Sequence, residues 1–146
     1  MKNNKLLIEG FVNLAVRRYL GPFWLRRSWL DKTQWLPEKK LETIQLHLLK
    51  RLVRYVELNI PFYASIMRQN NFSYNDINEL SDITRFPILH KQQILEAGSS
   101  IISQRYPKLL LRHAYTGGTT GRPMNIYRSP YSLGTEHAFL KRQWDW

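Results

Sequence analysis

The amino-acid sequence predicts an incomplete α/β fold, in which a helical N-terminal region precedes one strand–loop–strand–helix unit. Two observations carry this prediction. Up to residue 106, apolar side chains recur mostly at intervals of three and four, which is the helical spacing. After Pro107, two short apolar runs flank a loop rich in glycine and threonine, and a helix-start signal follows. The predicted organisation is a basic, aromatic-rich arm (1–36), a helical region (37–106) and the truncated start of an α/β subdomain (107–146).

The arm is expected to hold a helix from about Lys5 to Leu20, which Gly21-Pro22 ends. A second segment, Phe23 to Leu30, mixes Trp24 and Trp29 with arginines. Aromatic rings and arginines together are typical of segments that lie at a membrane surface. An arm that packs on the rest of the protein is the alternative interpretation, and it is favoured because the segment is short and its faces are not cleanly separated.

In the helical region, the clearest helix runs from Pro37 to about Asn59. Its apolar side chains are predicted to share one face: Leu41, Ile44, Leu48, Leu52 and Val56. A polar, turn-rich stretch from Ser73 to Leu80 lies further along. The other expected elements are a helix from Phe62 to Gln69, an extended linker from Phe86 to Leu89, and a helix from His90 to Ala97 that Gly98 closes.

The predicted α/β subdomain begins with a buried strand within Lys108 to Tyr115, because that stretch carries a run of leucines. Met124 to Tyr127 is expected to form the second strand, and Tyr131 to Trp146 the following helix. The helix has Leu133, His137, Leu140 and Trp144 at helical spacing. Two strands alone leave sheet edges unpaired and apolar faces uncovered, so we expect these residues to be only weakly stable by themselves.

Composition excludes several classes of protein. The absence of cysteine rules out disulfides, thiolate zinc sites and thiol catalysis. A net charge of +11 predicts affinity for polyanions, whether nucleic acid, anionic lipid or nucleotide phosphate. Nucleic acid is the least favoured of these, because the basic residues are dispersed and no zinc-finger or RNA-recognition motif is present. No signal peptide or membrane-spanning run is evident, so the sequence predicts a cytoplasmic protein, with contact to the inner membrane face as an option.

The most informative stretch is the loop from Thr116 to Pro123. Its three glycines allow sharp turns and close approach to a ligand, and exposed backbone N–H groups in such turns bind anions. Threonine hydroxyls can donate to phosphate oxygens, and Arg122 adds a fixed positive charge with a planar set of donors. The residues predicted to bind phosphate are Thr116, Gly117, Gly118, Thr119, Thr120, Gly121 and Arg122.

Other interpretations of the loop are weaker. The P-loop pattern requires lysine after the last glycine, where this chain has Arg122, and the dinucleotide pattern fails at Thr116. An ordinary hairpin turn remains the structural alternative, although the loop is longer than the usual two-residue turn. No catalytic residue and no metal ligand is predicted, because the histidines (His47, His90, His113 and His137) show no metal-binding spacing.

The stretch TGGTTGRP resembles the [ST]-[SG]-G-[ST]-T-G-x-P signature of adenylate-forming enzymes. Two further phrases, Asn59-Ile60-Pro61-Phe62-Tyr63 and Phe86-Pro87-Ile88-Leu89-His90-Lys91, are similar to phrases of the phenylacetate–CoA ligase group, which includes the CapK-like proteins of capsular polysaccharide clusters. Order and spacing agree from about Trp35 to the end of the chain. Many relatives have lysine where this chain has Arg122, so the contact made at that position differs.

The resemblance implies a reaction in which a carboxylate and ATP form an acyl-adenylate and pyrophosphate, often followed by transfer to coenzyme A. It implies that Thr116 to Thr120 bind the β- and γ-phosphates, that Gly117, Gly118 and Gly121 shape the loop, and that Mg²⁺ accompanies ATP. In the family the adenine pocket and the C-terminal catalytic lysine lie beyond this loop. We therefore expect no adenylation by this chain without the missing C-terminal part of the ligase.

A non-catalytic basic module that binds a membrane surface or nucleic acid is the alternative function, and a nonfunctional chain is the third.

Overall fold

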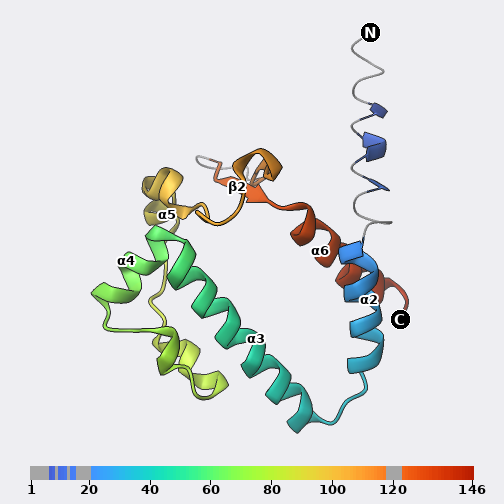
Figure 1. Cartoon of the computed structure of the whole chain (residues 1–146), viewed down its shortest axis with the longest axis horizontal. Helices are drawn as coiled ribbons and strands as arrows, with labels where there is room; N and C mark the ends of the chain where they lie inside the picture. Colours follow the sequence, from blue (N-terminus) through green and yellow to red (C-terminus); the bar gives the residue numbers. More distant parts are fainter. Residues whose placement is uncertain (1–6, 9, 13, 16–20, 118–122) are drawn as a thin grey trace. The chain divides into compact units, whose positions relative to one another are not determined.

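The structure is a computed structural model of the 146-residue chain, and it describes residues 7–8, 10–12, 14–15, 21–117 and 123–146. The described residues are mostly helical, with one small antiparallel sheet of two strands (Figure 1). This content agrees with a partial α/β fold. The chain divides into two compact units: the terminal unit is Met1–Leu36, Leu110–His113 and Arg128–Trp146, and the central unit is Pro37–Leu109 and Ala114–Tyr127.

The terminal unit is built around two packed helices, α2 (Gly21–Thr33) and α6 (Pro130–Trp144), which lie side by side in Figure 1. Their shared core is Phe23, Leu30 and Ala138. Gly21-Pro22 begins α2. The preceding helix was predicted to end at these residues, and that end falls beside residues 16–20, which lie outside the described residues. Proline is well tolerated in a first helical turn, because N–H groups there have no partner within the helix. Residues 7–8, 10–12 and 14–15 are helical, as expected.

A close approach and an ion-pair cluster hold α2 against α6. A side chain at Gly134 would meet the Pro22 Cβ at 3.2 Å and the Phe23 backbone nitrogen at 3.3 Å, so only glycine fits without displacement. Arg27 pairs with Asp31 one turn along α2, at 3.1 Å, and also reaches Asp145 beyond α6, at 2.8 Å. The four positions of α6 at helical spacing were predicted to share one apolar face. Leu133 is buried, but Trp144 is largely exposed, so this prediction is wrong at Trp144.

The central unit packs around α3 (Glu38–Asn59) and α4 (Pro61–Gln69). Its buried core is Val53, Met67, Phe72 and Ile77, with Leu46, Leu49 and Val56 of α3 against it. The predicted apolar face of α3 is therefore wrong in part: Val56 packs on this core, but Leu52 is 59% exposed. The helix carries two apolar stripes, and the elements that follow it in sequence cover only one of them.

Two short 3₁₀ turns, η1 (Tyr74–Asp76) and η2 (Leu80–Arg85), connect α4 to the extended linker before α5. The carboxylate of Glu57 on α3 accepts the backbone N–H of Tyr74 at 2.7 Å, which fastens η1 to the long helix. Asp76 likewise accepts the backbone N–H of Ser73 at 2.7 Å. These carboxylates therefore satisfy backbone groups of the turn, as a polar, turn-rich stretch requires.

Helix α5 (Lys91–Ala97) ends at Gly98, as predicted, and the φ of Gly98 is 55°, a conformation that favours glycine. The 3₁₀ turn η3 (Gly98–Ile101) follows. Two hydrogen bonds tie the segment after η3 to the end of α3: Gln104 N–H donates to the Asn59 carbonyl at 2.8 Å, and the Tyr55 and Ser103 hydroxyls lie 2.6 Å apart. The position of η3 within the central unit is thereby fixed.

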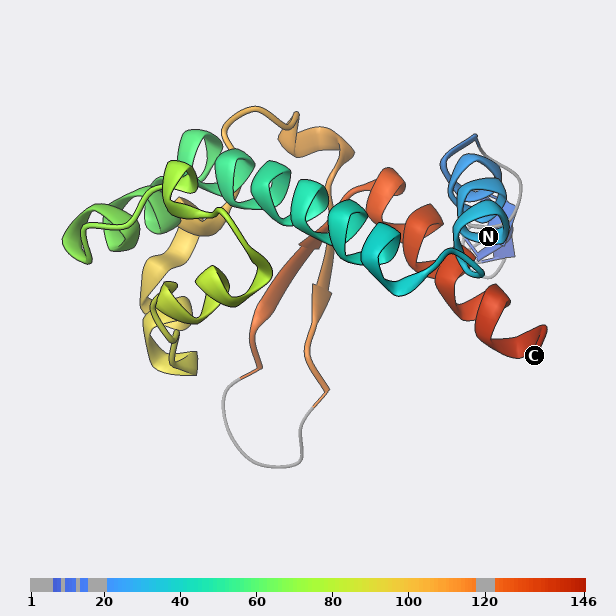
Figure 2. The ribbon, with the colours of Figure 1, turned by 90° about the horizontal axis from the view of Figure 1, so that it is seen from below.

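A β-hairpin completes the described structure. After the 3₁₀ turn η4 (Lys108–Leu110), strand β1 (Arg112–Tyr115) pairs with β2 (Asn125–Arg128), and the two run side by side in Figure 2. The strand pair was predicted, but β1 is mostly exposed instead of buried. Burial of a strand requires a layer packed on its face, and of the four β1 residues only Ala114 is partly buried. None of the helices in the described ranges combines the length and apolar character needed to cross a bilayer.

Candidate functional site

The base of the candidate loop is closed by a reciprocal pair of hydrogen bonds between Thr116 and Met124. The Thr116 backbone N–H donates to the Met124 carbonyl at 3.0 Å, and the Met124 N–H donates to the Thr116 hydroxyl oxygen at 3.0 Å. The first predicted site residue therefore has a structural role. Its hydroxyl oxygen accepts from the backbone, while the hydroxyl hydrogen is still able to donate to a ligand.

Gly117 is the second predicted residue that the structure describes. A side chain at this position would meet no described residue within 4 Å, so packing against the described part of the chain does not require glycine there. Close approach of a ligand to the backbone is a physical reason for glycine at such a position. The other predicted residues (Gly118, Thr119, Thr120, Gly121 and Arg122) lie outside the described residues, and their role stays a prediction.

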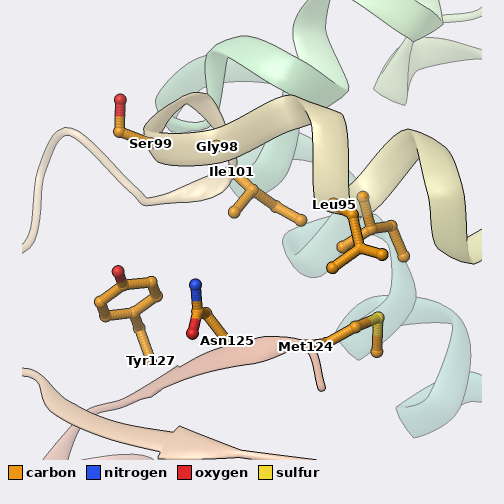
Figure 3. Close-up of a pocket in the computed structure, with 8 residues that line it drawn as sticks. Leu95, Gly98, Ser99, Ile101, Met124, Asn125 and Tyr127 are labelled. Carbon is orange, nitrogen blue, oxygen red and sulfur yellow. The ribbon is translucent and has the colours of Figure 1, made fainter. Parts of the chain in front are cut away.

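A pocket of about 250 Å³ lies in the central unit beside the base of the loop. Helix α5, turn η3 and strand β2 form its walls. Figure 3 shows Leu95 and Ile101 on one side and Met124, Asn125 and Tyr127 on the other. Met124 is therefore shared: its backbone closes the loop, and its side chain lines the pocket. The two sites are in contact through one residue.

The pocket wall is mainly apolar, with polar groups on Ser99, Asn125 and Tyr127. Such a lining suits a small, partly apolar group held by a few hydrogen bonds. This pocket was not predicted from the sequence. Alternation along β2 could have placed Asn125 and Tyr127 on the same face of the strand, but no local pattern predicts that η3 packs opposite them.

Glu136 and His137, an ionisable pair on α6 that follows the loop in sequence, both have structural partners. Glu136, which precedes His137 on α6, forms an ion pair with Arg128 at the end of β2. His137 lies between aromatic rings, with its ring centre 5.5 Å from that of Phe23 and 6.3 Å from that of Trp144. Within the described ranges, no group of three or more histidine and acidic side chains is arranged to hold a metal ion.

Two carboxyl groups have lowered pKa values for local reasons. The backbone N–H groups of Glu79 and Asn78 hydrogen-bond to Asp82 and lower the pKa of its carboxyl. A hydrogen bond from Lys141, assisted by the charges of Lys141 and Arg27, lowers the pKa of Asp145. Both groups are then ionised at neutral pH and act as hydrogen-bond acceptors, which suits structural roles.

Two curated proteins are similar to this chain. A stretch of 86 residues, 59% of the chain, is 31% identical to Protein CapK of Staphylococcus aureus and covers 18% of that protein. A stretch of 88 residues, 60% of the chain, is 30% identical to Phenylacetate-coenzyme A ligase of Thermus thermophilus and covers 20% of it. The chain therefore spans about a fifth of the length of the curated relatives it matches. No family model matches the chain.

Proposed function

We propose that the chain is the N-terminal part of an adenylate-forming carboxylate ligase of the phenylacetate–CoA ligase and CapK-like branch, and that its loop binds the phosphates of ATP. One observation carries the proposal: the TGGTTGRP stretch lies between paired strands whose loop is closed by Thr116 and Met124. Similarity to a protein named as a coenzyme A ligase supports the same reaction class.

The residues of the loop suit this chemistry. In the proposed reaction a carboxylate oxygen attacks the α-phosphorus of ATP, the bond to the bridging oxygen breaks, and pyrophosphate leaves. Backbone N–H groups of Gly117, Gly118 and Gly121 and the hydroxyls of Thr119 and Thr120 would hold the β- and γ-phosphates, where negative charge develops. Arg122 would add a fixed positive charge.

No described residue lies within 4 Å of the position that a Gly117 side chain would take, so nothing in the described part of the chain obstructs a phosphate group at this backbone position. Mg²⁺ would enter with the nucleotide and neutralise phosphate charge. Coenzyme A would accept the acyl group in a second step, giving a thioester and AMP. By the resemblance, such a ligase would act in the cytoplasm and contribute to surface polysaccharide biosynthesis.

Because the chain spans about a fifth of its relatives, we expect the groups that bind adenine and the acyl substrate to come from polypeptide beyond this chain. The chain alone should then bind Mg²⁺-ATP weakly and catalyse nothing. Pyrophosphate exchange, assayed with the purified chain over a panel of carboxylic acids, should show no turnover, and clear turnover would contradict this division of the site.

Binding to the loop can be tested by calorimetric titration with Mg²⁺-ATP. Arg122→Gln removes one charge from the loop, and Arg105→Gln removes the same charge from an exposed position of the central unit. A charge-assisted hydrogen bond contributes about 1.5–3 kcal/mol, so R122Q should weaken binding by roughly ten-fold or more, while R105Q should not. Equal weakening by both substitutions would indicate diffuse attraction to the basic chain, and would overturn the proposed site.

A further inference from the structure

The terminal unit carries a surface that the proposed ATP chemistry does not use. All five tryptophans of the chain belong to this unit. Four of them are exposed: Trp24 (56%), Trp35 (78%), Trp144 (67%) and Trp146 (78%). Tryptophan is normally among the well-buried side chains, and its exposure at several positions marks a surface for contact.

Two of these rings belong to one continuous cluster. Trp35 follows α2 and Trp146 follows α6, and their rings stack with centres 6.2 Å apart. The guanidinium carbon of Arg142 lies 5.5 Å from the ring centre of Trp146 and 5.7 Å from that of Phe139. A shallow hollow of about 210 Å³ lies beside them, lined in part by Leu140. We call Trp35, Phe139, Arg142 and Trp146 the tryptophan–arginine surface.

Charge in this unit has one dominant sign. The terminal unit contains eleven lysines and arginines against four acidic residues, whereas the larger central unit has eleven against seven. The helical residues near the N-terminus add an exposed apolar face, because Leu7, Phe11 and Leu14 are separated by four and three positions and are all exposed. Basic residues precede and follow that face in the sequence, at Lys5 and Arg17.

We propose that the terminal unit docks on an anionic lipid bilayer through the tryptophan–arginine surface. Tryptophan rings are amphipathic and concentrate where the headgroups of a bilayer meet its hydrocarbon. An arginine that lies against such rings keeps its charge at headgroup level while its stem covers apolar surface. The excess of positive charge selects anionic headgroups over zwitterionic ones. This inference is independent of the proposed ATP site.

Tryptophan emission of the purified 146-residue chain tests the proposal, because every tryptophan reports on the terminal unit. Vesicles of phosphatidylcholine with phosphatidylglycerol should shift the emission to shorter wavelength at about 0.1 M salt. Pure phosphatidylcholine vesicles should give little shift, and the anionic response should weaken as salt rises. No shift with anionic vesicles, or an equal shift with both kinds, would overturn the proposal.

Two pairs of variants test whether binding is local, with vesicle co-sedimentation as the readout. Trp35→Ala with Trp146→Ala removes the stacked rings, and Ile88→Ala with Leu109→Ala removes two exposed apolar side chains (84% and 100%) from the central unit. The first pair should lose at least about ten-fold in affinity, because each ring contributes a large apolar area. The second pair should bind like the unaltered chain. Equal loss in both pairs would contradict a local surface.

Charge is tested in the same way. Lys32→Gln with Arg142→Gln and Lys39→Gln with Lys40→Gln each remove two positive charges, from the terminal and the central unit respectively. Near an anionic surface each basic residue is worth about five-fold in affinity, so only the first pair should weaken binding strongly. Two results that point to a different partner would overturn the proposal of a lipid surface. Self-association with the same emission shift in the absence of lipid would indicate a second copy, and preferential binding of DNA over anionic vesicles would indicate nucleic acid.

Discussion

Thr116→Val tests how the base of the loop is closed, because it replaces only the hydroxyl of threonine by a methyl group. Valine keeps the shape of threonine, but it removes the hydroxyl that accepts the Met124 N–H at 3.0 Å. The second hydrogen bond of the pair, from the Thr116 N–H to the Met124 carbonyl, uses backbone atoms only and remains possible. The variant therefore removes one of the two hydrogen bonds between Thr116 and Met124, and the base of the loop should open more often.

The expected increase in amide hydrogen exchange follows from the loss of this single hydrogen bond. A net contribution of about 1 kcal/mol corresponds to roughly five-fold faster exchange of the Met124 amide hydrogen. Thr116→Ser retains the hydroxyl and should restore protection. Thr43→Val is the matched control, because it removes a hydroxyl that donates to the Lys39 carbonyl at 2.8 Å on α3. Met124 exchange that is unchanged in T116V, or changed equally in T43V, would refute the assigned role of Thr116.

Three further predictions concern the two units. Met67→Ala should destabilise the central unit by about 2–5 kcal/mol in urea unfolding, because Met67 is fully buried, whereas Leu52→Ala on the exposed stripe of α3 should have a much smaller effect. Gly134→Val should lower the stability of the terminal unit by about 1–3 kcal/mol, because even the Cβ of a side chain at that position would lie 3.2 Å from Pro22. Thermal unfolding followed by tryptophan emission should show a lower midpoint, and an unaltered midpoint would contradict the importance of this helix contact. Folding lowers the pKa of Asp82 from 3.8, so its carboxylate stabilises the folded chain above pH 3.8, and this stabilisation is lost as the pH falls through the pKa of the folded state. The D82N variant should therefore be less stable than the unaltered chain at neutral pH. In acid, urea unfolding should show no difference between the two.

Local signals predicted much of the helical structure. Pro61 at the first position of α4 and Gly98 at the end of α5 each fix the backbone by their own chemistry, and the boundaries follow them closely. Gly21-Pro22 is compatible with ending one helix and with beginning the next. The structure shows that this pair begins α2, and the predicted end of the preceding helix falls beside residues 16–20, outside the described part of the chain.

Tertiary packing was harder to predict than the helices themselves. Helix α3 has an apolar stripe through Leu48 and Leu52 and another through Leu49 and Val53, and periodicity alone does not tell which one the turn around Phe72 will cover. The burial of β1 was mispredicted for a different reason: Leu109 and Leu110, which suggested a buried strand, lie in η4, and β1 itself is Arg112–Tyr115.

At the site, local sequence placed the loop between two strands correctly. It could not show that the Thr116 hydroxyl closes the loop through Met124, because that contact joins residues eight positions apart. The pocket beside it depends on η3, which the hydrogen bond from Gln104 to Asn59 holds at the end of α3. Contacts of this kind come from the fold and leave no pattern in the neighbouring sequence.

The central claim is that the loop binds the phosphates of ATP, and amide NMR of ¹⁵N-glycine-labelled chain tests it most directly. The chain has seven glycines, and three of them, Gly117, Gly118 and Gly121, belong to the loop. Titration with Mg²⁺-ATP should shift these three signals and leave those of Gly98 and Gly134 in place, and the same concentration of sulfate should shift them far less. Loop signals that stay unmoved at saturating Mg²⁺-ATP, or that move equally with sulfate, would contradict the claim.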